Sequence, residues 1–459
     1  MRIYDTLTRQ KHEFTPVDKT VRLYVCGVTP YAPAHIGHAM SYITFDVVRR
    51  YLDYLGFDVE HIQNFTDIDD KLIERASAEH KDVSALAESH IEAYFRDMDS
   101  LNIIRAHKYP RATQEIPKMI EVISKLIEND FAYDSGGDVY FRVERAADYG
   151  KLSHRRLDGM RAGARVGVDE RKEHPMDFVL WKSAKKGEPF WTSPWGPGRP
   201  GWHIECTAMA LHYLGETVDI HGGGHDLIFP HHENEIAQSE AYTGQKPFAR
   251  FWMHNGLLQI DRQKMSKSLS NMVTISESIE TYSADALRLT MLGSHYRVPN
   301  AHSEELLAAA ERSVSRLSNA AALDGPTHDS ADQLDVSSYK EEFLVAMDDD
   351  FNTPNALAVL FGLARDINRA SDQGKSIQKA QQMLLELGRK ILGLRLEVET
   401  EKVSEELLAR IESLIEMRGQ LRKERDFTGA DKVRDELTEL GVTLTDSPTG
   451  TLWNLTDRE

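Results

Sequence analysis

Two histidines three residues apart are the first side chains whose types and spacing suggest chemistry. They lie in the run His35-Ile36-Gly37-His38, where a loop opens into a segment of helical spacing. The free amide groups and the dipole of a helix N-terminus favour bound anions. We therefore expect His35 and His38 to face a phosphate, with Gly37 leaving room for a flat base. Taken alone, the run equally fits histidines on a surface or in a core.

Two lysines form a second such pair, in the run Lys264-Met265-Ser266-Lys267-Ser268. Lysines three residues apart and flanked by hydroxyl groups can close over a triphosphate. They would neutralise the charge that grows when the α-phosphate is attacked. Taken alone, the same run describes a solvated loop.

Two cysteines, a histidine and a glutamate make a candidate metal site. Cys26 and Cys206 are too few for a disulfide framework, and a helix expected from about residue 230 carries His231, His232 and Glu235. Residues three or four apart share a helix face, so either histidine can join Glu235. Two thiolates, an imidazole and a carboxylate suit a tetrahedral Zn²⁺. The alternative is two unrelated buried cysteines beside a helix N-terminus.

The elements around these groups read as a strand, a helix and a second strand. Residues 19–26 alternate apolar and polar side chains, and residues 58–65 form another strand pattern. Between them, apolar residues four apart predict a helix from about residue 38 to a stop at Gly56. Parallel strands joined in this way have a right-handed crossover and bind ligands at the carboxyl end of the first strand.

The rest of the chain changes character twice. Glycine and proline clusters between residues 115 and 200 indicate an insertion, after which the α/β pattern resumes. From about residue 272 the pattern is helical almost to the end, and residues 352–370 predict a helix of a bundle. Residues 326–337 form a polar linker.

Composition limits the class of protein. A chain of 459 residues suggests about three domains. Its 41% hydrophobic and 28% charged content is that of a soluble globular protein, and it has neither a membrane-spanning run nor a secretory leader. We therefore expect a cytoplasmic protein. A formal net charge of -18 disfavours indiscriminate binding to nucleic acid but allows a local contact.

The C-terminal segment carries such a local basic patch. Residues 418–434 contain six basic and three acidic side chains, a local charge of +3. One helix precedes the patch, and Thr428 and Asp431 resemble a capping box that opens a second helix. The patch favours an RNA partner, although a solvated basic face has the same composition.

The histidine and lysine runs together resemble the two signatures of class I aminoacyl-tRNA synthetases. With the cysteines included, the whole chain resembles the cysteinyl-tRNA synthetase family, from the run Tyr4-Asp5-Thr6-Leu7 to the run Gly450-Thr451-Leu452-Trp453. The most specific stretches are residues 64–71, 175–182 and 229–238.

This resemblance implies a role for each group of residues. The implied metal ligands are Cys26, Cys206, His231 and Glu235. The residues implied around bound cysteine are Thr66, Trp202, His221 and Asp226. ATP binding is implied for His35, Gly37, His38 and Lys267, and catalysis for His35, His38, Lys264 and Lys267. The residues implied to read the anticodon are Arg422, Asp431, Asp446 and Trp453.

The implied fold is a doubly wound, parallel-sheet, Rossmann-like α/β catalytic domain with an insertion, followed by mostly helical domains. The expected domains are 1–115 with 201–270 (catalytic), 116–200 (insertion), 271–335 (stem contact), 336–398 (helical bundle) and 399–459 (anticodon binding).

The implied activity is ATP-dependent activation of L-cysteine to cysteinyl-adenylate, followed by transfer to the 3′ end of tRNA(Cys). One Zn²⁺ for each chain, Mg²⁺ with the ATP and a monomeric state are expected with it. The alternative is a ligase that joins activated cysteine to an amino-sugar. Such a ligase shares both signatures and the metal site but lacks the C-terminal module that residues 400–459 resemble.

Overall fold

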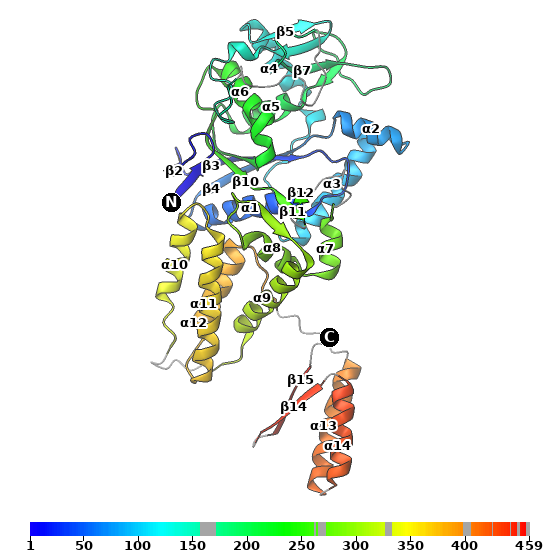
Figure 1. Cartoon of the computed structure of the whole chain (residues 1–459), viewed down its shortest axis with the longest axis vertical. Coiled ribbons are helices and arrows are strands. Elements are labelled where there is room, and N and C mark those ends of the chain that lie inside the picture. The colour runs from blue at the N-terminus through cyan, green and yellow to red at the C-terminus, as the bar shows by residue number, and fades with distance from the viewer. Residues whose placement is uncertain are drawn as a thin grey trace. The chain divides into compact units, whose positions relative to one another are not determined.

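The chain divides into two units, Met1–Leu396 and Glu397–Glu459. The computed structural model (Figure 1) describes residues 1–156, 171–260, 263–264, 272–325, 333–397, 405–424, 426–440, 442–447 and 450–455. No helix among these described residues is long and apolar enough to cross a membrane.

A four-stranded parallel sheet forms the centre of the first unit. Its strands are β3 (Thr20–Val28), β4 (Asp58–Phe65), β9 (Val218–Gly224) and β10 (Ala249–Asn255). They are arranged in the order β10-β9-β3-β4, and every neighbouring pair is parallel. This confirms the predicted doubly wound α/β class. It also confirms the strand predicted over residues 58–65.

Side chains alternate between two cores because successive residues of a strand point to opposite faces. Leu23 and Val25 of β3 belong to the core on the side of α1 (Ile36–Tyr54). Tyr24 and Cys26 belong to the core on the other side. That second core contains residues of α4 (Ile116–Glu128), α5 (Trp202–Leu214) and α6 (Glu233–Thr243). The two thiols can therefore meet, since Cys206 lies on α5.

An antiparallel sheet stands apart from the parallel one, at the top of Figure 1. Its strands, in their spatial order, are β5 (Ala132–Ser135), β6 (Asp138–Phe141), β7 (Phe178–Ser183) and β8 (Gly198–Pro200). The sheet lies between β4 and β9 in sequence, where the glycine and proline clusters indicate an insertion. The limits proposed for the domains stay predictions.

Helices make up most of the remaining first unit. Their bounds are α2 (Asp70–Ala78), α3 (Val83–Ser100), α7 (Ile275–Thr281), α8 (Ala284–Leu292), α9 (Glu304–Ala322), α10 (Ser337–Asp348), α11 (Thr353–Asp372) and α12 (Gln378–Leu385). Helix α11 confirms the bundle helix predicted over residues 352–370.

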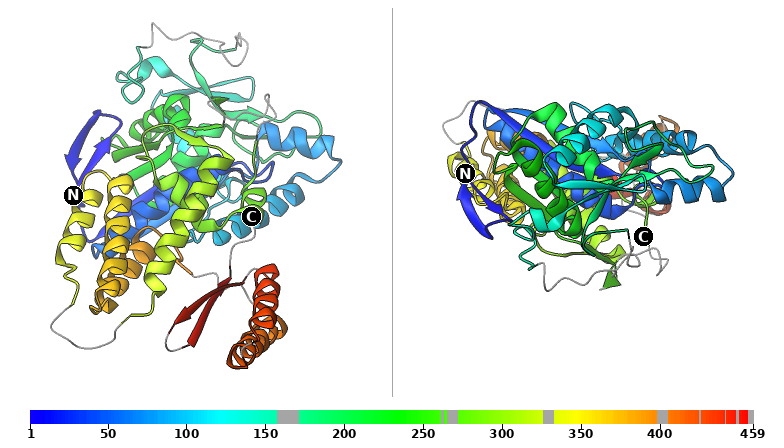
Figure 2. Two further views of the ribbon diagram at one scale, coloured as in Figure 1. Left: turned by 60° about the horizontal axis from the view of Figure 1, so that its bottom comes forward. Right: turned by 90° about the horizontal axis from the view of Figure 1, so that it is seen from above.

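Short strands complete the first unit. They are β1 (Arg2–Asp5), β2 (Gln10–Glu13), β11 (Leu258–Ile260), β12 (Gln263–Lys264) and β13 (Asn300–His302). The antiparallel hairpin β1–β2 lies beside the helices drawn in yellow in both views of Figure 2. Arg2 forms an ion pair with Asp349 there, at 3.1 Å.

The second unit consists of α13 (Glu405–Lys423), α14 (Phe427–Glu439) and the antiparallel strands β14 (Val442–Ser447) and β15 (Gly450–Leu455). The expectation of helix almost to the end is therefore wrong for the last residues. The missed signal is the alternation of β-branched and apolar residues over 442–445, which is typical of a strand.

Three predicted helix starts also need correction. Helix α1 begins at Ile36, because His35 has an extended backbone and its side chain accepts a hydrogen bond from the His38 amide. Helix α6 spans Glu233–Thr243, and a π-helical turn over Ile228–His232 leads into it, with a non-helical backbone only at Phe229 before the proline. The cap of α14 is Asp426 rather than Thr428: its Oδ1 accepts from the Gly429 amide at 2.9 Å.

Candidate active site

The site lies where the connections of the parallel sheet diverge. Strands β3 and β9 are neighbours, yet β3 continues to β4 on one side and β9 to β10 on the other. Ligands of such sheets bind outside the carboxyl ends of the two strands at this point. A cavity of about 400 Å³ lies there, lined by Cys26, His35, Gly37, His38, Trp202 and Asp226 among others.

Gly27 permits the close approach of two strands beside this cavity. A Cβ atom at this position would lie 1.6 Å from the Asn64 carbonyl oxygen, so no larger residue fits. The Gly27 amide donates to Asn64 Oδ1 at 2.8 Å. This contact holds the end of β3, and with it Cys26, against the end of β4.

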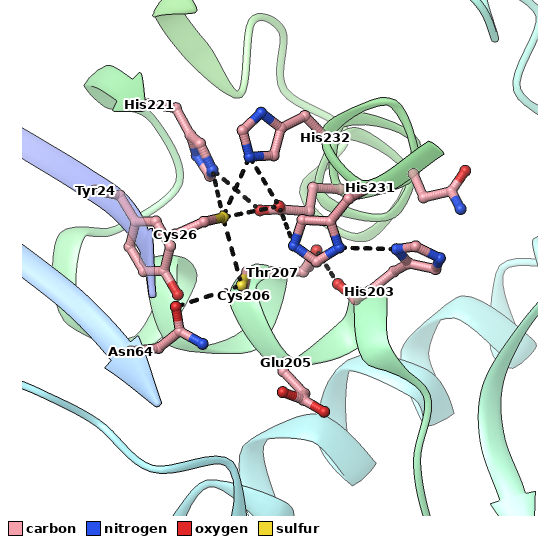
Figure 3. Close-up of polar contacts among 12 residues, drawn as sticks. Tyr24, Cys26, Asn64, His203, Glu205, Cys206, Thr207, His221, His231 and His232 are labelled. Atoms are coloured by element: carbon pink, nitrogen blue, oxygen red, sulfur yellow. Dashed lines mark hydrogen bonds and ion pairs between the residues drawn. The ribbon is translucent and has the colours of Figure 1, made fainter. Parts of the chain in front are cut away.

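The four implied metal ligands come together in a buried cluster (Figure 3). One ligand atom from each of Cys26, Cys206, His231 and Glu235 lies within 4.8 Å of the others. The Cys26 and Cys206 sulfurs are 3.7 Å apart, and His231 Nε2 is 3.0 Å from Glu235 Oε1. His231 lies in the turn before α6 and still reaches Glu235, so the expected pairing does not require a shared helix.

Burial controls the protonation of this cluster when no metal is bound. It raises the pKa of the Glu235 carboxyl and of the Cys26 thiol well above their usual ranges. The Cys26 thiol donates to Cys206, and this hydrogen bond lowers the pKa of Cys206 to about 7. Glu235 Oε2 is buried without a hydrogen-bond donor. A bound cation would provide the compensating charge that the ionised forms of these buried groups need.

A second set of histidines surrounds the same cluster. His221 Nε2 is 3.7 Å from Cys26 Sγ and His232 Nε2 is 3.2 Å from it. Both residues, with Cys26 and Glu235, also meet the distance condition for a metal group. Burial lowers the pKa of His221 and of His232 well below the usual value, so both imidazoles are neutral. The distances alone thus do not decide which of these histidines would bind a metal.

A stacked pair of rings connects the cavity to the cluster, because Trp202 lines the cavity and contacts His231. The Trp202 side chain is 40% exposed and stacks on the His231 imidazole with ring centroids 4.3 Å apart. His231 Nδ1 is 2.9 Å from His203 Nδ1, which orients the ring. His221 and Thr66, implied to surround bound cysteine, are buried.

Thr66 belongs to a short buried network. Its hydroxyl donates to Glu205 Oε2 at 2.7 Å, and the Asn64 amide donates to it at 3.4 Å. Asn64 Oδ1 lies 3.6 Å from Cys206 Sγ. Glu205 has a raised pKa because of its burial. The network links Thr66 to Cys206 of the buried cluster.

The two histidines of the first signature close the N-terminus of α1. Their rings stack with centroids 3.7 Å apart. His35 Nδ1 accepts from the His38 amide, and His38 Nδ1 accepts from the His35 amide, both at 3.3 Å. Burial lowers the pKa of His38 well below the usual value. A neutral His38 can accept or donate a hydrogen bond to a ligand in the cavity.

The remaining implied residues lie outside this geometry. Lys267 is outside the described residues, and for Lys264 only the backbone, in β12, is described. Arg422 and Asp431 are exposed on α13 and α14 of the second unit. For Asp446 and Trp453 the structure describes only the backbones of β14 and β15.

Sequence reasoning missed several neighbours of the cluster, namely Asn64, His203, Glu205 and His254. Asn64 stood in a run already singled out, residues 64–71, and Glu205 directly precedes Cys206 in the sequence. Their short spacing to Thr66 and Cys206 was the available signal. His203 and His254 become neighbours only through the packing of α5 and β10 against the cluster.

Comparisons with known proteins agree with this geometry. Residues 13–312 match the family model of the class I (C) tRNA synthetase catalytic domain, and residues 342–397 match the DALR domain. The cysteine–tRNA ligase of Dehalococcoides mccartyi strain 195 is 53% identical over 456 residues, covering 99% of each chain. The chain belongs to the cysteinyl-tRNA synthetase family.

Other cysteinyl-tRNA synthetases match over a similar length. The cysteine–tRNA ligase of Caldicellulosiruptor saccharolyticus is 48% identical over 467 residues, covering 98% of this chain and 99% of that one. Among solved structures, a Mycobacterium tuberculosis methionyl-tRNA synthetase in complex with methionyl-adenylate has a TM-score of 0.59 at 18% identity, over 82% of this chain and 88% of that one. This likeness supports the class I fold alone.

Proposed function

We propose that the chain activates L-cysteine with ATP to cysteinyl-adenylate and transfers the cysteinyl group to the 3′ end of tRNA(Cys). The observation that carries this proposal is the opening of the Cys/His/Glu cluster onto the cavity beside the α1 N-terminus. One cavity thus offers a thiol-selective group and an anion-binding helix end.

The metal is Zn²⁺, held by Cys26, Cys206, His231 and Glu235. A tetrahedral site with Zn–S bonds of about 2.3 Å places its two sulfurs about 3.8 Å apart. The Cys26 and Cys206 sulfurs are 3.7 Å apart, which fits such a pair. When bound, Zn²⁺ supplies a Lewis acid that prefers a soft thiolate to a hydroxyl group. The four residues thereby select the side chain of the amino acid.

The reaction itself needs no protein nucleophile. A carboxylate oxygen of cysteine attacks the α-phosphorus of ATP, which forms an O–P bond, and pyrophosphate leaves with Mg²⁺. His35 and His38 hold the phosphates at the α1 N-terminus, while Lys264 and Lys267 neutralise the growing charge. Trp202 and Asp226 line the place of the amino acid beside the cluster, and Thr66 and His221 support it from behind.

The second unit serves tRNA. Arg422, Asp431, Asp446 and Trp453 are the residues that we propose to read the anticodon, by hydrogen bonds and by stacking on splayed bases. We expect a monomer to be sufficient, because the described cluster and cavity are built from one chain.

Amino-acid-dependent exchange of pyrophosphate into ATP, measured across the amino acids, tests the first step. Charging of tRNA(Cys) tests the second. We expect exchange with cysteine and not with serine, because Zn²⁺ prefers a thiolate to a hydroxyl group, whereas shape alone would separate such near-isosteres by only about 10². Exchange followed by transfer to an amino-sugar, without tRNA charging, would favour the alternative ligase.

A further inference from the structure

Three side chains that the proposed function does not use connect Cys26 to the N-terminal hairpin. His232 Nε2 is 3.2 Å from Cys26 Sγ, and His232 Nδ1 is 2.7 Å from His254 Nε2. His254 Nδ1 is in turn 2.8 Å from the Thr6 hydroxyl. Cys26, His232 and His254 are all buried. Each nitrogen of both imidazoles therefore has one protein partner.

The hairpin that carries Thr6 is held firmly against the strand that carries His254. The Thr6 amide donates to the Trp252 carbonyl at 2.9 Å, and the Trp252 amide donates to Asp5 Oδ1 at 3.0 Å. Trp252 lies on β10, two residues before His254. The run Tyr4-Asp5-Thr6-Leu7, which the function has left without a role, thus positions the Thr6 hydroxyl.

His232 is not one of the four proposed metal ligands, and its distances fit a hydrogen bond to the Cys26 sulfur. Sulfur and nitrogen ligands of one tetrahedral zinc lie about 3.5 Å apart for Zn–S of about 2.3 Å and Zn–N of about 2.0 Å. The His232 nitrogen is closer than that to Cys26, at 3.2 Å, and is 3.9 Å from Glu235 Oε1. By contrast, Cys26 Sγ lies 3.6 Å from Glu235 Oε1, as expected for two ligands. His232 therefore has the position of a hydrogen-bond partner of the sulfur.

We propose that His232 donates its Nε2–H to the metal-bound Cys26 thiolate, and that the Thr6 hydroxyl supports this arrangement by donating to His254 Nδ1. The proposal rests on the metal site of the proposed function. A metal-bound thiolate has no proton and can only accept a hydrogen bond. A neutral imidazole has one donor and one acceptor.

The direction of the other two hydrogen bonds follows from these rules. If His232 Nε2 carries the proton, His232 Nδ1 must accept from His254 Nε2–H. His254 Nδ1 must then accept, so the Thr6 hydroxyl donates. Hydrogen bonds to a ligating atom orient it and adjust its electron donation to the metal. Thr6, His232 and His254 are thus positioning residues for a ligand that selects the substrate.

The full-length chain loaded with Co²⁺ provides the test, because its thiolate-to-cobalt absorption band reports the electron density on sulfur. We expect Thr6→Val to move this band to longer wavelength, since a thiolate with a weaker hydrogen bond gives up charge more easily. It should also lower cobalt affinity by about 3- to 10-fold, which corresponds to one hydrogen bond. Thr6→Ser retains a hydroxyl and should restore both values.

A matched control comes from the same hairpin. The Thr8 hydroxyl is 2.7 Å from His12 Nε2 and lies outside the chain of hydrogen bonds, so Thr8→Val should leave band and affinity unchanged. His254→Phe removes the donor to His232 and should lower affinity by about 10- to 100-fold. Thr6→Val and Thr6→Ser decide the question if His254→Phe does not fold.

Several results would overturn the proposal. One is a thiolate band that stays the same in Thr6→Val, and another is an equal change in Thr8→Val. A change confined to the ligand-field bands would make His232 a metal ligand instead of a donor to sulfur. If the unaltered chain bound Co²⁺ without any thiolate band, the metal site of the proposed function would itself be wrong.

Discussion

His35 and His38 occupy the hydrogen-bonding groups of a helix end that a phosphate would use. Each ring accepts from the backbone amide of the other at 3.3 Å, which is long for such a bond. The amide groups can therefore exchange a weak ring acceptor for a strong phosphate acceptor. The proposed role in ATP binding gives His38 two tasks: capping the helix end and contacting the nucleotide.

Substitution of His38 separates these tasks. We expect His38→Ala to reduce adenylate formation by about 2–4 kcal/mol, as for loss of one donor to a developing charge. His38→Asn keeps an acceptor for the His35 amide and should preserve thermal stability while losing a similar amount of activity. Pyrophosphate exchange and thermal melting measure the two effects. If both variants lost less than about tenfold in activity, His38 would only cap the helix and would not contact the nucleotide.

Cys206 differs from Cys26 in its readiness to ionise. Its pKa of about 7 makes it the thiolate that is available before metal arrives. We expect Cys206→Ser to purify with much less than one zinc for each chain and to raise the KM for cysteine more than it lowers kcat. Metal analysis and exchange kinetics check this. Normal cysteine activation and rejection of serine by a metal-free chain would contradict it.

At the level of elements, a buried arginine joins the catalytic domain to the helices that follow it. Arg288 of α8 is fully buried, and its Nη2 is 2.6 Å from Asp46 Oδ2 of α1. Its other hydrogens reach the Leu101 and Leu392 carbonyls, at 2.9 and 3.1 Å from Nη1 and Nε. This side chain therefore fixes α8 to α1, the helix whose N-terminus we propose to bind the phosphates.

Removal of Arg288 breaks its buried ion pair with Asp46, which keeps Arg50 as a partner at 2.8 Å, and takes this donor from the Leu101 and Leu392 carbonyls. We expect Arg288→Met to lower the free energy of unfolding by about 3–5 kcal/mol. The double variant Arg288→Met with Asp46→Leu should lose less than the sum of the two single variants, because both single variants break the same buried ion pair. Denaturant unfolding of the unaltered chain, of each single variant and of the double variant measures these free energies. A double variant as unstable as the sum of the singles would show that the two residues act independently.

At the scale of the whole molecule, each unit has its own core. The second unit buries Ile411, Leu414, Val433, Leu437 and Val442 together. The cavity, the cluster and the α1 N-terminus all lie in the first unit, before Leu396. We therefore expect amino-acid activation to be independent of the second unit, to which we assign recognition of the anticodon.

Deletion of residues 400–459 checks this division of tasks. We expect cysteine-dependent pyrophosphate exchange to stay within about twofold, since the first unit keeps its core, while tRNA charging falls by about 10² or more. An equal loss of both activities would mean that the second unit is required for the fold of the first. Charging that survives the deletion would remove the anticodon assignment.

Sequence patterns were sufficient for the class of fold. The alternation over residues 19–26 and the apolar spacing that follows are local properties, and they predicted β3, α1 and β4 within two residues of their bounds. Patterns were less informative where a single residue decides the backbone. Phe229, before a proline, has an extended backbone in the turn that precedes α6, and the alternation that marks β14 was overlooked because it is short.

The amino-acid types by themselves determined which groups do chemistry: two thiols, a Pro-His-His-Glu run and the His-Ile-Gly-His signature. They left open which histidine joins Glu235, because both spacings suit a helix face. The tertiary structure added the neighbours, since His254 and Thr6 approach His232 only when β10 pairs with β9 and the N-terminal hairpin binds to β10. Contacts between residues distant in sequence depend on this packing, and no local pattern encodes them.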